Sequence, residues 1–473
     1  MSRVGMGRIA AAAVAFTLVA AACSGYPRED PAATSGLAQT STTQAPSGAN
    51  GVTGAGGSGR QAGSSGGALG PTSGGGLAGQ GPGSRGSQAP QWPSAGLFNA
   101  DEDRIGITDD EILICMHAPF VFAEIFDNRP EDEKIYFDMV NAEQGGVYGR
   151  NVRLIFTDDA YQPSQAITAA EECKSQNPFF IMGGVGFDQT PAVREWAETN
   201  RMLYFYSIAT EKGAEGKRYS FTPAPSVEQL GTILAQWVVK KFPDKRVGVV
   251  YRISDNWNGG RDAFIAELER HGNSVVADIG VDANQSVYQQ EIAALEAANA
   301  EIVFFHENAL NWLKMIPQAR NQGYTPRWIG EVGFNLVTDT LGQDVLDPPA
   351  QVVWVTPSFD RTNPNLPWAR EIDRIEAAYA KYHPDNKEPN DVDWMFWLAL
   401  KGVHQMLLDC GPACTRNTLA GMLESGYRGV VPPLCPADFS AGHLGGYQAN
   451  IFEAVPRGNG SVWENVATCK SGF

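Results

Sequence analysis

Positive charge is scarce in this 473-residue chain, where 36 Lys and Arg residues stand against 53 Asp and Glu residues and the net charge is −17. The part of the chain that should fold has no cluster or stripe of Lys and Arg, which makes nucleic acid a poor partner. It also lacks the motifs G-x-S-x-G and H-E-x-x-H and any S-x-x-K in a nucleophile context, and its six histidines show no triad spacing. We therefore expect no enzymatic activity and no cofactor.

One long apolar run is present, over residues 9–22, behind a start that carries two arginines. Such a run is typical of an export signal and is short for a membrane span. Cys23 follows three alanines, in an arrangement that resembles a bacterial lipoprotein cleavage site. We expect a signal peptide over residues 1–23, a lipid on Cys23, and anchoring at the outer face of the bacterial cytoplasmic membrane. Cleavage as an ordinary secretory signal is the alternative.

From Ser24 to about Ala100 the chain consists mostly of Gly, Ser, Ala, Thr, Pro and Gln, and only Arg60 and Arg85 are charged between Pro31 and Ala100. A segment of this composition cannot bury enough apolar surface to offset the entropy lost on ordering. We predict a disordered tether over residues 24–103.

Cysteine is also sparse, with seven residues in the chain and six once Cys23 is set aside. An even number of cysteines in an exported chain indicates disulfides. The alternative is a zinc site formed by Cys410, Cys414, Cys435 and Cys469, although the spacing is not that of a usual knuckle.

From Arg104 onward, short apolar runs alternate with amphipathic helical stretches such as 132–142 and 163–173. This alternation indicates parallel sheets covered by helices on both faces, and the length exceeds one such core, so we predict two α/β lobes. The expected strands are 112–116, 152–157, 179–184, 203–206, 246–251, 274–279, 302–306 and 327–331.

One stretch shows how the first lobe begins. The helix over 132–142 should stop at Gly145-Gly146, which tolerate a left-handed backbone, and Gly149 turns the chain into the strand 152–157. Asp158-Asp159 leave that strand at its carboxyl end. The pattern is the helix-to-strand return of a βαβ unit.

The order of several motifs resembles the type I periplasmic-type solute-binding proteins of the branched-chain amino acid class. The likeness covers roughly residues 104–473. It is carried by Asn141, Gly145-Gly146, Gly149-Arg150, Val152, Leu154, Asp158-Asp159, Pro163 and Ala169-Ala170, and by the stretches 183–192, 207–211, 218–226 and 317–324.

The resemblance implies two doubly wound lobes that exchange chain at three crossovers. The first lobe would take residues 104–224 and 358–430, and the second 225–357 and 431–473. This arrangement fits the disulfides Cys115–Cys173, Cys410–Cys414 and Cys435–Cys469.

In open parallel sheets, ligands lie beyond the carboxyl ends of the strands. In amino-acid-binding relatives, the ligand carboxylate meets amides and hydroxyls at positions matching 187–190 and 208–210, where Thr210 matches and Phe187 replaces a usual serine. A ligand ammonium would need a carboxylate, and Asp188, Asp255, Glu307 or Glu331 could supply it. Three aromatic residues, Phe120, Phe187 and Trp257, suggest an apolar or aromatic ligand body. The expected ligand-binding residues are Phe120, Phe187, Asp188, Thr190, Ile208, Ala209, Thr210, Asp255, Trp257, His306, Glu307 and Glu331.

A metal site formed by His117, His306, Glu307 and Glu331 is an alternative for the same region. The function that the resemblance implies is a monomeric, lipid-anchored receptor that delivers a small molecule (an amino acid, an amide, or an apolar or aromatic acid) to an ABC permease and its ATPase. A sensor that presents the same fold to a signalling partner is the alternative. The ligand itself stays open.

Overall fold

The computed structural model describes residues 92–120, 128–183, 186–206, 210–331, 351–354, 369–431, 434–457 and 460–473. The expected signal peptide, Cys23 and most of the expected tether lie outside these residues. Among the helices of the described part, none is long and apolar enough to cross a membrane.

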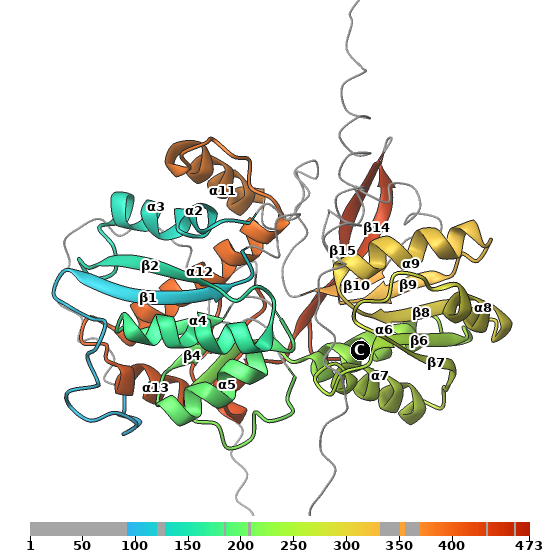
Figure 1. The fold of residues 1–473 in the computed structure, drawn as a ribbon, viewed down its shortest axis with the longest axis horizontal. Helices are drawn as coiled ribbons and strands as arrows, with labels where there is room; N and C mark the ends of the chain where they lie inside the picture. The colour runs from blue at the N-terminus through green and yellow to red at the C-terminus, as the bar shows by residue number, and fades with distance from the viewer. Residues whose placement is uncertain are drawn as a thin grey trace, which may run out of the picture. The chain divides into compact units, whose positions relative to one another are not determined.

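The first lobe is built on an eight-stranded sheet. Its strands are β1 (Glu111–Ala118), β2 (Asn151–Asp158), β3 (Phe180–Gly183), β4 (Tyr204–Phe205), β5 (Ser220–Pro225), β11 (Arg428–Gly429), β12 (Ala437–Asp438) and β13 (Leu444–Gly446). They lie in the order β11-β12-β13-β5-β4-β3-β1-β2. Figure 1 shows β1 beside β2 at one end of this order. All neighbours from β2 to β13 are parallel, and β12 and β11 add antiparallel pairs at one edge.

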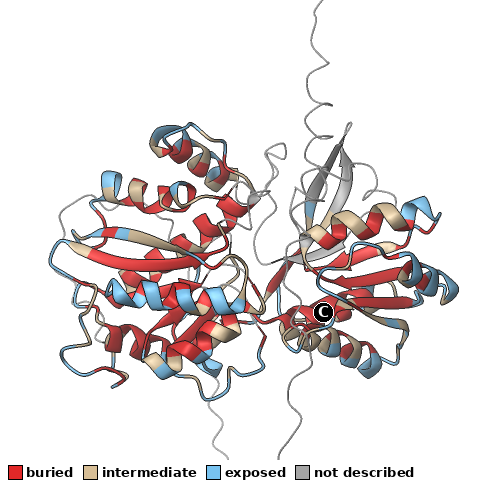
Figure 2. Ribbon diagram, viewed as in Figure 1, coloured by how far each residue is buried: buried red, intermediate tan, exposed pale blue. Residues whose placement is uncertain are grey.

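Helices cover both faces of this sheet, and strand β1 is accordingly apolar on both sides. Ile114 and Met116 of β1 belong to one buried cluster, whereas Cys115 belongs to another. Figure 2 shows exposed residues along the outer face of the helix over 163–175 and buried ones beneath it. The helices of this lobe are α2 (Pro130–Glu133), α3 (Ile135–Gln144), α4 (Pro163–Ser175), α5 (Gln189–Asn200), α11 (Ala369–Tyr382), α12 (Asp391–Cys410) and α13 (Arg416–Glu424).

The second lobe is built on a seven-stranded sheet. Its strands are β6 (Val247–Arg252), β7 (Val275–Val281), β8 (Ile302–His306), β9 (Arg327–Gly330), β10 (Gln351–Trp354), β14 (Ala449–Arg457) and β15 (Gly460–Lys470), and its helices are α6 (Val227–Lys241), α7 (Asn258–Arg270), α8 (Gln289–Ala297) and α9 (Ala309–Asn321). The order is β15-β14-β10-β9-β8-β6-β7, parallel from β7 to β10 and antiparallel beyond. The two α/β lobes that the sequence predicted are therefore confirmed.

The eight expected strands are all present, and the glycine turn behaves as predicted. Gly145 ends α3 with φ of 71°, and Gly146 and Gly149 also have positive φ, of 71° and 82°. A Cβ on Gly146 would lie 1.9 Å from the carbonyl oxygen of Arg150, so a side chain there would have to displace backbone. The expected helix over 132–142 is divided between α2 and α3, which meet at Lys134.

The tether was predicted to run to residue 103, and that boundary is wrong. Leu97 and Phe98 are buried in the core of the first lobe. The Oδ1 atom of Asn417 accepts hydrogen bonds from their backbone N–H groups at 2.7 and 3.0 Å, and Trp92 Nε1 donates to the carbonyl oxygen of Asp409 at 2.7 Å. Residues 92–103 therefore belong to the folded domain, because their apolar side chains have a surface to pack against.

The expected start of the last second-lobe segment, at residue 431, is also wrong. Strands β12 and β13 extend the first sheet, and the chain reaches the second sheet only at β14. Gly446 lies opposite Pro225, and a Cβ on Gly446 would lie 1.9 Å from the carbonyl carbon of Ala224. Only glycine allows this close backbone approach.

The structure contains the disulfides Cys115–Cys173, Cys410–Cys414 and Cys435–Cys469. The first joins β1 to α4, the second closes a short loop after α12, and the third joins the segment before β12 to the end of β15. The four cysteines of the alternative zinc site are therefore used in two of these bonds.

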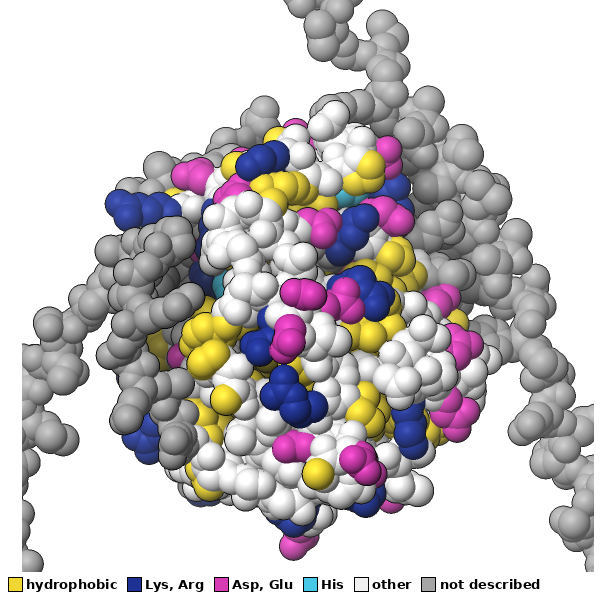
Figure 3. Space-filling model, turned by 90° about the vertical axis from the view of Figure 1, so that its left-hand side faces the viewer, with side chains coloured by type: hydrophobic (Ala, Val, Ile, Leu, Met, Phe, Trp, Pro, Cys, Tyr) yellow, Lys and Arg dark blue, Asp and Glu magenta, His cyan; other side chains and the backbone are white. Residues whose placement is uncertain are grey.

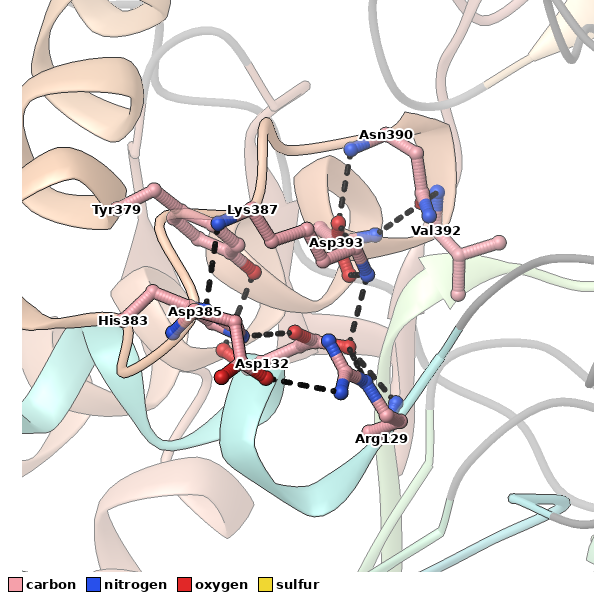
Figure 4. A network of polar contacts seen from close by, with 9 residues as sticks. All are labelled: Arg129, Asp132, Tyr379, His383, Asp385, Lys387, Asn390, Val392 and Asp393. Atoms are coloured by element: carbon pink, nitrogen blue, oxygen red, sulfur yellow. Dashed lines mark hydrogen bonds and ion pairs between the residues drawn. The ribbon is translucent and has the colours of Figure 1, made fainter.

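Charges of both signs are interspersed on the face of the first lobe that Figure 3 shows. A denser set of charges is buried between α2 and the start of α12 (Figure 4). Lys387 Nζ lies 2.8 Å from Asp132 and 3.1 Å from Asp393, and His383 Nε2 lies 2.7 Å from the other oxygen of Asp132. Burial raises the pKa of Asp393 from 3.8 to about 7, and burial also raises the pKa of the adjacent Glu133 carboxyl well above its ordinary value.

This cluster predicts that the folded state loses stability as the pH rises. A carboxyl whose pKa is higher in the folded than in the unfolded state binds its proton more tightly when folded, so its contribution is present below pH 4 and is lost as pH rises to about 7. We expect Asp393→Asn to remove part of this slope. Urea unfolding should show that the free energy of unfolding of the variant, relative to that of the parent, rises by on the order of a few kcal/mol from pH 4 to pH 8. An equal difference at both pH values would contradict the prediction.

Candidate functional site

The segment between β3 and α5 places two expected site residues, Phe187 and Asp188, beyond the carboxyl end of the first sheet. Gly186 precedes them with φ of 141°, and a Cβ there would lie 1.9 Å from Oε1 of Gln189. The side-chain Nε2 of Gln189 in turn donates to the carbonyl oxygen of Tyr161 at 2.6 Å. The glycine therefore allows the chain to turn tightly into α5 over a fixed glutamine.

Phe187 meets two residues of the second lobe. Its ring centroid lies 4.4 Å from that of Trp257, at an interplanar angle of 71°, and 6.3 Å from that of His306. Trp257 directly precedes α7, and His306 ends β8. Edge-to-face packing of this kind is a favourable aromatic geometry. The strand ends of both sheets thus contribute to one aromatic cluster.

Asp188 is held by donors from the loop between β6 and α7. Its Oδ1 atom accepts from Ser254 Oγ at 3.0 Å and from Asn256 Nδ2 at 2.9 Å, and its Oδ2 atom accepts from Trp257 Nε1 at 3.3 Å. Arg252 Nη1 lies 4.0 Å from Oδ2. This carboxylate therefore links the first lobe to the second.

Arg252 is the functional candidate that the sequence analysis missed. It forms two hydrogen bonds of 2.8 Å with the carboxylate of Glu307, whose side chain is 0% exposed, and its guanidinium lies 4.5 Å from the ring centroid of Trp257. Burial alone would lower the pKa of Arg252, but the hydrogen bonds and charge of Glu307 outweigh burial and raise that pKa. The only signal in the sequence was its place at the end of an apolar strand.

His306 is clamped between a carboxylate and a carbonyl. Its Nδ1 atom lies 2.5 Å from Glu331 Oε2, and its Nε2 atom donates to the carbonyl oxygen of Trp257 at 2.8 Å. Burial lowers the pKa of His306, but the Glu331 carboxylate and the Trp257 carbonyl outweigh burial and raise it. Both ring nitrogens can thus act as donors, and the charged imidazolium is favoured.

All four acids that could have held a ligand ammonium are engaged within the chain. Asp188, Glu307 and Glu331 have the partners described above. Asp255 was expected to bind the ligand, but its side chain is 84% exposed and pairs with Lys212 at 3.0 Å. A ligand ammonium would therefore have to displace a partner that the protein already supplies.

The remaining expected residues are divided. Thr190 is buried in the first turn of α5, where its N–H donates to the carbonyl oxygen of Gly186, so this amide, one of those expected to meet a ligand carboxylate, already has an acceptor. Thr210 Oγ1 donates to Glu228 at the start of α6. Phe120 packs on Phe156 within the first lobe, at 5.8 Å between centroids. Ile208 and Ala209 lie outside the described residues.

The alternative metal site is not supported. His117 Nδ1 lies 2.8 Å from Asp159 and its Nε2 lies 2.9 Å from the hydroxyl of Tyr204, all within the first lobe. Over the described ranges, no group of three or more His, Cys, Asp or Glu side chains is placed to hold a metal ion.

A cavity of about 140 Å³ lies mainly in the first lobe, next to the carboxyl end of its sheet, and Leu230 of α6 also lines it. The ends of β3, β4 and β5 line one side, and α12 lines the other. The segments around β12 and β13 complete it. No pattern in the sequence indicates this cavity.

A family model described as "Periplasmic binding protein" matches residues 133–455. The chain belongs to this family, as a type I member of the branched-chain amino acid class, which agrees with its two α/β lobes.

Two curated relatives are Leu/Ile/Val-binding proteins. Homolog 3 of Brucella melitensis is 28% identical over 199 residues, which are 41% of this chain and 54% of that protein. The Leu/Ile/Val-binding protein of Escherichia coli is 22% identical over 242 residues, 50% of this chain and 64% of that protein. The chain spans only about half of the length of the curated relatives that it matches.

Solved structures share the fold over more of the chain. A fatty acid ABC transporter substrate-binding protein from Thermomonospora curvata has a TM-score of 0.61 and 18% identity and covers 78% of this chain and 94% of its own. A solute-binding protein from Rhodopseudomonas palustris was solved in complex with 3,4-dihydroxybenzoic acid. It has a TM-score of 0.59 and 17% identity, and the match covers 77% of this chain and 99% of that protein. At these identities the likeness concerns the fold.

Proposed function

We propose that the protein is an exported, lipid-anchored receptor that captures a small molecule between its two lobes and delivers it to an ABC-type importer. The observation that carries the proposal is the meeting of strand-end residues from both sheets, where Phe187 and Asp188 contact Trp257 and its neighbours. Closure over a ligand would bury it against these groups. Anchoring through Cys23 would keep the receptor near the permease.

The class of solute is inferred from the relatives and from the residues at these strand ends. The names of relatives include Leu/Ile/Val-binding and fatty acid transport, and one neighbour was solved with an aromatic acid. In this chain, Phe187 stands at the position where relatives usually have a serine. The candidate acids Asp188, Asp255, Glu307 and Glu331 already have partners within the chain. An apolar or aromatic acid or an amide fits these features better than a free amino acid, whose ammonium would find these four candidate carboxylates already paired.

Replacing Trp257 with alanine should weaken solute binding by about 30-fold, because a buried aromatic side chain at the centre of a site commonly accounts for about 2 kcal/mol. Calorimetric titration with aliphatic amino acids, small amides, and aliphatic and aromatic acids would measure the loss. Trp237→Ala is the matched control, since Trp237 is as deeply buried as Trp257 but packs on Phe242, at the end of α6. Phe187→Leu serves as a milder second variant if Trp257→Ala lowers the melting temperature.

Equal affinity of the Trp257 variant and the parent would remove the site assignment. Delivery is tested separately, by uptake of the bound solute into cells that lack the gene and into cells that carry it again. Uptake that requires the gene supports the receptor role. Uptake that is unchanged, with binding intact, would favour a sensor.

A further inference from the structure

The cavity of about 140 Å³ in the first lobe is lined by apolar side chains. Among the described residues that surround it, none carries a charge, and the polar groups are limited to Tyr206, Tyr427 and Gln448. The hydroxyl of Tyr427 is already bonded to Asp409. Such a surface offers little to water or to an ion and suits an uncharged hydrocarbon group.

The cavity lies at the same edge of the sheet as the site. Gly183 ends β3, Tyr206 follows β4 and Pro225 ends β5, and all three line the cavity. Phe187 and Asp188 follow β3 along the chain, beyond the same carboxyl edge. A solute bound at this edge could therefore place one end in the cavity.

Helix α12 is shaped to leave this space open. Gly402 lies in the interior of the 20-residue helix, where glycine is unfavourable. It lines the cavity, and an added Cβ would meet only Leu434 Cδ1, at 4.0 Å. A Cβ would therefore fit there, and filling a void commonly stabilises a fold. An occupant explains why the space is kept.

The volume sets the size of that occupant. An engineered apolar cavity of about 150 Å³ in another protein stays dry and binds benzene. We propose that this cavity binds the apolar end of the captured solute, as a phenyl ring or an alkyl chain of about six carbon atoms. The solute would then be an organic acid or amide with an uncharged apolar tail, an inference that rests on the proposed receptor function.

The proposal is tested with straight-chain carboxylates of increasing length, titrated into the purified full chain. The affinity should rise about fourfold with each added methylene until the cavity is full, and then level off. Gly402→Leu should abolish this rise. Gln165→Leu, on the exposed face of α4, is the matched control and should preserve it.

Benzene gives a second measurement on the unaltered chain and on Gly402→Leu. It carries no polar group, so an increase in the melting temperature of the unaltered chain that disappears in Gly402→Leu would support an apolar site in this cavity. Affinities that do not depend on chain length, or that Gly402→Leu leaves unchanged, would overturn the inference. If Trp257→Ala still weakened binding in that case, the receptor function would stand. A chain that binds no acid, amide or amino acid would overturn both.

Discussion

Replacing Arg252 with methionine should lower the free energy of unfolding by about 3–5 kcal/mol, as expected when one partner of a buried ion pair is removed. The variant would leave the Glu307 carboxylate, which is 0% exposed, without the two hydrogen bonds that now hold it. It would also remove the guanidinium from the face of Trp257. Unfolding by urea, followed by circular dichroism, measures the loss.

Two further variants separate the buried charge from the rest of the side chain. Arg252→Met combined with Glu307→Leu should recover much of the loss, because replacing both partners of a buried pair by apolar groups is often neutral. Lys212→Met, which breaks the exposed pair with Asp255, should change the stability by less than about 1 kcal/mol. The prediction fails if Arg252→Met costs no more than Lys212→Met.

Removing the disulfide Cys115–Cys173 by paired alanine substitutions should cost about 4 kcal/mol. The two cysteines are 58 residues apart, so the bond restricts a long loop of the unfolded chain. Both side chains are also fully buried between β1 and α4, where the smaller alanines pack less well. Urea unfolding under oxidising conditions measures the difference.

The matched control is the pair Cys410 and Cys414, which are only four residues apart. Removing that bond should cost about 2 kcal/mol, because a short loop has little entropy to lose. Equal losses for the two disulfides would show that loop length does not set their contributions. A larger loss for the short loop would contradict the prediction directly.

The parallel strands could be predicted from the sequence because they are apolar throughout. In β1, for example, Ile114, Cys115 and Met116 are all buried, which only a strand covered on both faces requires. The short strands β12 and β13 gave no such signal. Their pairing depends on Gly446 approaching the backbone of Ala224, a contact between residues far apart in the chain. For that reason the expected boundary at residue 431 was placed too early.

The meeting of strand ends from both sheets could be predicted from the sequence, but the partners of their side chains could not. The rule that ligands lie beyond strand ends selected Phe187, Trp257 and His306, and the structure brings these three together. The partners of the acids could not be foreseen. Asp188 was a candidate for binding a ligand ammonium, yet it accepts hydrogen bonds from Ser254 and Asn256 of the second lobe. These donors are far from Asp188 in the sequence, and only folding places them opposite it.

The bond between Cys435 and Cys469 spans the last passage of the chain from one sheet to the other. Cys435 lies just before β12 of the first sheet, and Cys469 lies near the end of β15 in the second. Tyr447, in the connection between β13 and β14, is exposed to solvent. A protease that cuts this connection would leave its two products covalently joined, so the terminal hairpin of β14 and β15 would be retained after a nick.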